Sequence, residues 1–169
     1  MGKRARVLDS EDRRHGREQP KLSIPAMLTI FTLTIYTDCS GIDAPARALA
    51  NLGLPLRHLG VSDINPASRA FLIEQFAPEV MFSDMTQRRI FPARGTVHFY
   101  FCGFPCQSFS SAGLNKGLTH EMAGIIAALL VSIMMAQPWV VVIENVPNII
   151  QRHADVLQLL LTKLRAIGK

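Results

Sequence analysis

The sequence contains few cysteines, and their arrangement argues against two kinds of site. Only three occur in 169 residues, Cys39, Cys102 and Cys106, and no two of them form a Cys-x-x-Cys pair. An odd number without close pairs is not typical of a disulfide framework or of a zinc site. We therefore expect a protein of the reduced interior of the cell, without a metal ion.

Long apolar stretches are also missing. The longest, residues 125–136 and 140–143, are too short to span a bilayer. Residues 1–20 are charged rather than apolar, so no secretory signal is visible. Because 49% of the residues are hydrophobic and 18% are charged, the chain should still bury a core. These features predict a soluble globular protein with no membrane association.

Positive charge is concentrated near the N-terminus. The formal net charge is +5, and residues 1–21 hold seven Lys or Arg against four Asp or Glu. This segment is poor in large apolar residues, which is typical of a flexible tail. We predict a basic tail over residues 1–22, either a solvated leader or an arm for nucleic acid or nuclear import. One globular domain should occupy residues 23–169.

Strand-like and helix-like segments alternate from residue 27 onward. Apolar and β-branched runs predict strands at residues 28–37, 56–62, 80–83, 97–102 and 139–143. Helical periodicity predicts helices at residues 45–52, 66–76, 121–137 and 148–166. The last of the strands is a continuous apolar run, as in a central parallel strand. This alternation predicts an α/β fold with a doubly wound parallel sheet, which binds ligands at the carboxyl ends of its strands.

Three polar turns follow the first three predicted strands. Residues 38–45 read Asp-Cys-Ser-Gly-Ile-Asp-Ala-Pro, where Gly41 lets the backbone approach a ligand and the next helix N-terminus favours a carboxylate or phosphate. Asp63 follows roughly 20 positions later and suits the hydroxyls of a ribose. Asp84 could accept a hydrogen bond from an adenine amino group. The alternatives are an ordinary strand–helix turn and simple caps, with Asn65 capping the helix that Pro66 opens.

A candidate nucleophile follows the fourth predicted strand. Residues 103–110 read Gly-Phe-Pro-Cys-Gln-Ser-Phe-Ser, so Cys106 stands on a loop at the expected ligand edge. Cysteine suits attack on an electron-poor carbon, and Pro105 stiffens the backbone before it. Cys102 lies within a strand and is interpreted as a small buried apolar residue, and Cys39 is also expected to pack.

A carboxylate follows the fifth predicted strand, in the sequence Glu-Asn-Val-Pro at residues 144–147. On leaving an apolar strand, Glu144 should be partly desolvated and able to hold or deliver a proton. The alternative is a helix cap at Asn145 or Asn148. Cys106 and Glu144 on adjacent strand ends suggest a nucleophile paired with an acid.

Taken together, these motifs resemble the cytosine C5 methyltransferase family. Residues 103–110 and 144–147 look like its two most diagnostic motifs, in matching order and spacing. Residues 38–45, 62–66 and 83–85 look like its three cofactor motifs, and residues 111–118 like the segment after the nucleophile loop. The resemblance covers about residues 30–169. It implies a doubly wound, Rossmann-like S-adenosylmethionine-dependent methyltransferase fold.

The resemblance also implies roles for individual residues. Asp63 would hold the ribose of S-adenosylmethionine, Ile64 would pack on its adenine, and Asp84 would bind the adenine amino group. The other cofactor-binding residues would be Ser40, Gly41, Ile42, Met85 and Pro105. Residues that contact the substrate would be Gln107, Ser108, Asn145 and Val146.

The implied reaction acts on a cytosine flipped out of the stack. Cys106 would attack ring carbon 6, while Glu144 binds N3 and the exocyclic amine. Carbon 5 then takes the methyl group and loses its proton, and elimination releases the enzyme. DNA is the expected substrate, and tRNA is the alternative within the same family. The expected location is the nucleus of a eukaryote or the cytoplasm of a bacterial or virus-infected cell.

The sequence departs from the family pattern at several places. Cys39 stands where the family usually has phenylalanine, which weakens adenine stacking, and Asp43 replaces a glycine and could repel a carboxylate-bearing ligand. Met122 and Ala123 replace an Arg-Gly pair. The family continues with an arginine-bearing motif, a target-recognition region and a final cofactor segment, none of which follows Lys169. We therefore expect a fold truncated after about five strands, as a fragment, a split subunit needing a second chain, or an inactive binding or regulatory homologue.

Overall fold

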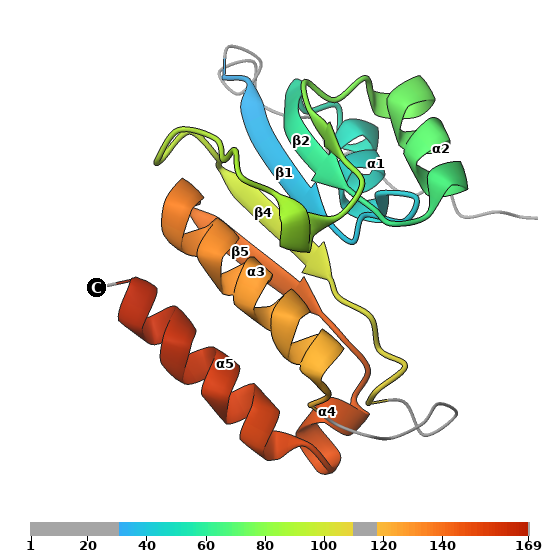
Figure 1. The fold of residues 1–169 in the computed structure, drawn as a ribbon. Coiled ribbons are helices and arrows are strands. Elements are labelled where there is room, and N and C mark those ends of the chain that lie inside the picture. The colour runs from blue at the N-terminus through green and yellow to red at the C-terminus, as the bar shows by residue number, and fades with distance from the viewer. Residues whose placement is uncertain (1–30, 110–117, 169) are drawn as a thin grey trace, which may run out of the picture.

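The computed structural model describes residues 31–109 and 118–168, which build a five-stranded sheet flanked by helices (Figure 1). The strand order is β3-β2-β1-β4-β5, and all neighbouring strands are parallel. The strands are β1 (Leu33–Asp38), β2 (Leu56–Ser62), β3 (Met81–Phe82), β4 (Phe99–Gly103) and β5 (Val140–Glu144). The chain moves outward from β1 to β3 and then returns to place β4 beside β1. This is a doubly wound sheet, and the predicted fold class is confirmed.

Helices cover the sheet from two sides. They are α1 (Ala44–Asn51), α2 (Pro66–Phe76), the 3-10 helix η2 (Met85–Gln87), α3 (His120–Ala136), α4 (Asn148–Gln151) and α5 (Ala154–Ile167). Helices α1 and α2 contact β2, whereas α3 contacts η2 and α5 beside β4 and β5 (Figure 1). Alternate residues of β1 therefore enter different layers, with Tyr36 in the core that α3 and α5 cover.

Local signals in the sequence explain most helix starts. Proline stands in the first turn of α1 and of α2, where its missing N–H costs nothing. Asn65 caps α2, because its Oδ1 accepts from the backbone N–H of Ala67 at 2.8 Å. The proposed division at residue 22 falls within residues 1–30, which lie outside the described part of the chain.

The predicted helix over residues 148–166 is wrong in one respect. The chain forms two helices, because Arg152 (φ −124°, ψ −14°) and His153 (φ −129°, ψ 40°) leave the helical region between them. The His153 ring packs edge-on against Phe109, with ring centroids 5.3 Å apart. Phe109 and His153 lie far apart in the sequence, so helical periodicity alone does not reveal their contact.

The fifth strand differs from the central strand that its apolar run predicted. Among the described residues β5 has a neighbouring strand on one side only. Val140 and Val142 remain 42% and 43% exposed, whereas Val141 and Ile143 pack against the core. Val141 and Ile143 line an apolar groove of about 880 Å³ between β5, α3, α4 and α5.

A buried ion pair joins four elements beneath the strand ends. Arg88, only 4% exposed, donates two hydrogen bonds of 2.7 Å to the carboxylate of Asp38 at the end of β1. It also donates to Tyr36 and to Ser132 of α3, while Tyr100 of β4 donates to Asp38. Burial opposes the charge of Arg88, but its hydrogen bonds and proximity to Asp38 outweigh burial and raise the pKa of Arg88. Arg88 is therefore charged in the folded chain.

Candidate active site

A pocket of about 640 Å³ opens at the carboxyl ends of the strands, where a doubly wound sheet binds its ligands. This volume lies within the usual range of about 300–1,000 Å³ for small-molecule sites. It is lined by Cys39, Ser62, Asp63, Ile64, Asp84, Met85, Thr86, Gly103, Phe104, Pro105, Cys106, Gln107, His120, Glu121, Gly124, Ile125 and Glu144. Eight residues predicted for the site line this one pocket: Asp63, Ile64, Asp84, Met85, Pro105, Cys106, Gln107 and Glu144.

Backbone donors hold Asp63 in place at the end of β2. The N–H of Gly41 donates to its Oδ2 at 2.7 Å, and the N–H of Asn65 donates to its Oδ1 at 2.8 Å. Each carboxylate oxygen has a second lone pair, so the group can still accept two hydroxyls. Ile64 follows with 74% of its surface exposed, which places an apolar side chain at the pocket wall.

Asp84 serves as a cap and as a pocket residue at once. Its Oδ1 accepts from the backbone N–H and the hydroxyl of Thr86, at 2.8 Å and 2.7 Å. Both of these bonds use the same oxygen. The capping role foreseen as an alternative is therefore present, and it leaves Asp84 on the pocket wall.

The first turn behaves differently from its prediction. Asp43 is fully buried, and its carboxylate accepts from the N–H of Ala46 at 3.2 Å and from the hydroxyl of Thr37 at 2.8 Å. The anion expected at the N-terminus of α1 is thus the side chain of Asp43 itself. The expectation that Asp43 faces a ligand is wrong, because this carboxylate points into the protein beneath α1.

His58 of β2 is the buried neighbour of Asp43. Its Nε2 lies 3.3 Å from Oδ2 of Asp43, and its Nδ1 has no hydrogen-bond partner among the described residues. Burial lowers the pKa of His58 to about 4 and raises the pKa of Asp43. His58 is therefore neutral near pH 7. Burying a neutral ring with one unpaired nitrogen costs less free energy than burying a charged imidazolium would.

Three predicted cofactor residues do not line the pocket. Ser40 uses its hydroxyl within the turn, at 3.1 Å from the carbonyl of Ser62 and 2.8 Å from the hydroxyl of Thr37. Gly41 has a positive φ of 54° and open space where a Cβ would stand, and Ile42 is 69% exposed outside the pocket. Their contribution is to shape the turn that carries Cys39.

The loop that carries Cys106, residues 104–109, is called the cysteine loop, and it is held at both ends. Phe104 and Phe109 are buried, and their ring centroids lie 6.1 Å apart. Cys106 stands between them in the sequence and lines the pocket. Asn145 donates to the carbonyl of Phe104 at 2.9 Å, and Asn148 donates to the carbonyl of Phe109. Cys106 is half-buried on this loop.

Glu144 lies directly beside the start of that loop. In the β4–β5 register it pairs with Gly103, and its Oε2 lies 3.2 Å from the position that a Cβ at residue 103 would take. A side chain at residue 103 would therefore push the carboxylate aside. Glu144 is exposed, so the expectation that it is partly desolvated is wrong for this chain.

Two predicted substrate residues lie elsewhere. Asn145 and Val146 line the apolar groove rather than the pocket. The amide of Asn145 bonds to Phe104, and its Oδ1 accepts from the N–H of Val146. No side-chain hydrogen bond caps α4, so neither Asn145 nor Asn148 has the capping role foreseen as an alternative. Ser108 is half-buried and does not line the pocket.

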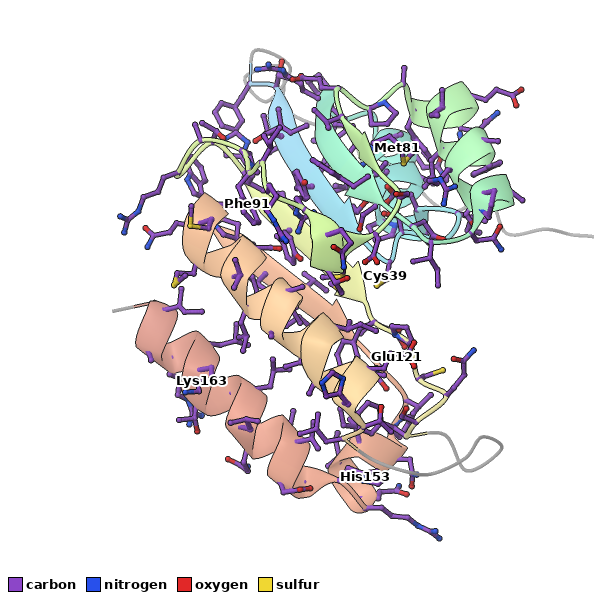
Figure 2. All side chains as sticks on the ribbon, viewed as in Figure 1. Cys39, Met81, Phe91, Glu121, His153 and Lys163 are labelled. Carbon is purple, nitrogen blue, oxygen red and sulfur yellow. The ribbon has the colours of Figure 1, made fainter. Side chains whose placement is uncertain are left out.

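Sequence reasoning missed several pocket residues. Cys39 lines the pocket instead of only packing, and its Sγ lies 3.6 Å from Sδ of Met85. Figure 2 labels Cys39 and also Glu121, which enters from the start of α3 together with His120. No predicted motif included His120 or Glu121, although they directly precede Met122 and Ala123, where the family has an Arg-Gly pair.

Cys102 has the role that was predicted for it. It is 2% exposed inside β4, and a hydrogen bond to Cys39 together with burial raises the pKa of its thiol. Cys102 therefore remains a neutral thiol at neutral pH.

Residues 31–109 and 118–168 form neither a membrane-spanning helix nor a cluster of metal ligands. No helix there is both long and apolar enough to cross a bilayer. The same residues include no group of three or more His, Cys, Asp or Glu side chains arranged to hold a metal ion.

Comparisons with known proteins place the chain among methyltransferases. The type II methyltransferase M.CviJI of Paramecium bursaria Chlorella virus IL3A is 27% identical over 143 residues, covering 83% of this chain and 36% of that protein. A DNA N-6-adenine-methyltransferase of Escherichia phage P1 is 31% identical over 125 residues, covering 66% and 16%. The S. pombe Dnmt2 methyltransferase superposes with a TM-score of 0.54 at 15% identity, over 78% of this chain and 40% of that one.

The solved structure supports the fold alone, and the chain spans only 36% of the length of M.CviJI. The family described as C-5 cytosine-specific DNA methylase matches residues 37–168, a range that runs from the last two residues of β1 through α5 and includes every predicted motif. The resemblance inferred from the motifs is confirmed: this chain belongs to the C-5 cytosine-specific DNA methylase family.

Proposed function

We propose that this chain takes part in transferring a methyl group to carbon 5 of cytosine in DNA, through a covalent bond to Cys106. One observation carries the proposal: Cys106 and Glu144 open into the same pocket as Asp63 and Asp84. A nucleophile and a carboxylate thus adjoin a set of groups suited to a nucleoside.

S-adenosylmethionine fits the residues of this pocket and would supply the methyl group when bound. Asp63 would hold the ribose hydroxyls with the lone pairs that Gly41 and Asn65 leave free. Ile64 offers an exposed apolar surface for the adenine, and Asp84 offers a carboxylate for its amino group. Met85 and Pro105 add apolar walls.

Cys106 would act on a cytosine flipped into the pocket. Its sulfur would form a bond to ring carbon 6, while Glu144 binds N3 and the exocyclic amine and stabilises the charge that develops there. Carbon 5 would then take the methyl group and lose its proton. The bond between sulfur and carbon 6 breaks in the last step, which returns Cys106 to its starting state.

The cysteine loop also bears on which base is modified. Methylation at an exocyclic amino nitrogen, as the name of the phage relative describes for that protein, requires no bond between the enzyme and a ring carbon. A half-buried cysteine facing the pocket therefore favours cytosine carbon 5. Gln107 and Ser108, beside Cys106, would contact the flipped nucleotide.

We also propose that the complete reaction needs further polypeptide, on the same chain or on a second one. The partly exposed Val140 and Val142 on one face of β5, and the apolar groove that Val141 and Ile143 line on the other, favour such a neighbour. A cell interior is the setting that free thiols favour.

Product analysis tests this proposal against its alternatives. The chain, together with a polypeptide that completes the domain, is incubated with labelled S-adenosylmethionine and with DNA or tRNA in parallel, and the nucleosides are separated by mass spectrometry. We expect 5-methylcytosine in DNA, which a Cys106→Ala variant does not form. Label in tRNA alone would favour the RNA enzyme, and N6-methyladenine would contradict the proposal. Failure to bind S-adenosylmethionine or transfer its methyl group would favour an inactive homologue.

A further inference from the structure

Phe109 connects the cysteine loop to the helix that follows β5. Its backbone N–H donates to the carbonyl of Cys106 at 2.9 Å, and its own carbonyl accepts from the side-chain amide of Asn148. The ring of Phe109 is fully buried, edge-on to Phe104 and to His153, at centroid distances of 6.1 Å and 5.3 Å. Every part of Phe109 is therefore held by a neighbour.

This arrangement leaves few degrees of freedom between Asn148 and Cys106. The turn from Cys106 to Phe109 is closed by one backbone hydrogen bond, so a shift of Phe109 would move Cys106 with it. Asn148 is the first residue of α4, and the element after β5 thus holds the distal end of the loop. At the proximal end, Asn145 bonds to Phe104 in the same way.

The side chain of Asn148 is not explained by the stability of its own helix. The cap residue of α4 is Pro147, and α4 has no side-chain cap hydrogen bond. The amide of Asn148 reaches across to the loop 39 residues earlier in the sequence. Its hydrogen bond therefore acts on the loop rather than on the helix that carries it.

We propose that Asn148 is a positioning residue for Cys106. By holding the carbonyl of Phe109, its side-chain amide fixes the position of the Cys106 thiol in the pocket. This inference rests on the proposed role of Cys106 as the nucleophile. A displacement of about 1 Å at a reacting group can cost about 100-fold in rate. Loss of the amide should therefore slow the capture of a base by Cys106 without changing the groups that hold the cofactor.

The substitution Asn148→Asp gives the sharpest test, because it keeps the shape of the side chain and replaces the amide donor by an acid that can donate only when protonated. An ionised carboxylate would face the carbonyl of Phe109 with two acceptors and no hydrogen, whereas the protonated acid can donate. The variant should thus lose the contact near neutral pH and regain it as pH falls toward about 4 to 5, near the ordinary pKa of aspartic acid. Asn148→Ala has no donor at any pH.

The measurement is the rate at which Cys106 bonds to DNA containing 5-fluorocytosine, at saturating S-adenosylmethionine. We expect the Asn148→Asp variant to be about 10- to 100-fold slower than the unsubstituted chain near pH 7.5, with the half-saturating cofactor concentration unchanged. Near pH 5 it should be faster than the Asn148→Ala variant measured at the same pH. His153, which contacts Phe109, is present in both variants, so its effect on the rate is common to both.

Gln151→Glu provides the matched control, since it makes the same amide-to-acid change at an exposed position of the same helix. An unchanged rate for Gln151→Glu with a reduced rate for Asn148→Asp supports the positioning role. Equal rates for all variants, or an Asn148→Asp variant that matches Asn148→Ala at every pH, would overturn it.

Hydrogen exchange separates this inference from the proposed function. If the unsubstituted chain forms no bond to DNA even with a polypeptide that completes the domain, the proposed function fails, and the amide of Phe109 still reports on the contact. Faster exchange over residues 105–109 in Asn148→Asp, with β5 and α3 protected as before, would show that Asn148 holds the loop. Unchanged exchange there would show that it does not.

Discussion

At the scale of single residues, the site combines polar groups that face the pocket with others that face away from it. Asp63 and Asp84 keep their carboxylates at the pocket wall, whereas Asp43 turns its carboxylate into the protein. The sequence marked Asp63 and Asp84 as candidate cofactor ligands, and Asp43 as a departure from the family pattern that could repel the ligand. Their directions depend on long-range partners such as His58, and these partners are not visible in a local motif.

The neutral state of His58 predicts a pH dependence of stability. Burial lowers the pKa of His58 in the folded chain to about 4, below its ordinary value of 6.5 in the unfolded chain. The unfolded state then binds more protons between these values, so the stabilisation present above pH 6.5 is lost as pH falls toward 4. We expect the free energy of unfolding in urea to drop by about 1 to 2 kcal/mol from pH 7 to pH 5.

A His58→Leu variant serves as the comparison for this measurement. It has no ring to protonate, so its stability should change less over the same pH interval. Asp43, whose pKa is raised, contributes with the opposite sign at lower pH and is present in both proteins. Parallel pH profiles for the two proteins would contradict a neutral, buried His58.

At the scale of elements, most strands and helices follow from periodicity and proline placement. Strands β2, β4 and β5 and helices α1, α2 and α3 lie close to their predicted ranges, because each has a strong local pattern. Strand β1 begins at Leu33, later than the predicted residue 28, since residues 31 and 32 are not part of the strand. The break between α4 and α5 does not follow from a local pattern. It coincides with a contact between His153 and Phe109, two residues that lie 44 positions apart in the sequence. The sequence likewise gave no sign that Arg88, in a short segment after η2, would be buried.

The buried pair of Arg88 and Asp38 predicts a large effect on stability. Replacing Arg88 by Met keeps an unbranched apolar stem but leaves the carboxylate of Asp38 buried without its cation. Breaking such a pair typically costs about 3 to 5 kcal/mol. We expect a loss of that size in the free energy of unfolding, measured by urea titration and circular dichroism.

The neighbouring Arg89 offers the control for this prediction. It is exposed, and its guanidinium makes only a long 3.4 Å contact to the carbonyl of Arg88. Arg89→Met should change stability by no more than about 0.5 kcal/mol. If both variants lost the same amount, the ion pair would not be what joins η2 to β1 and α3.

At the scale of the whole molecule, most of the candidate catalytic and cofactor-binding residues lie at one edge of the sheet. The fold class and the eight pocket residues were predictable, because parallel strands bring their carboxyl ends together. The contribution of α3 through His120 and Glu121, and the support of the cysteine loop by two asparagines, were not predictable. They depend on how separate elements pack against each other.

The central claim is that Cys106 bonds to a cytosine in DNA, and covalent trapping tests it most directly. In DNA with 5-fluorocytosine the fluorine blocks the last elimination, so a working nucleophile stays attached to the base. The chain is mixed with this DNA and S-adenosylmethionine, and complexes that survive denaturation are counted. We predict an adduct that is lost in Cys106→Ala and kept in Cys39→Ala. An adduct that persists without Cys106, or that maps to another residue, would contradict the account.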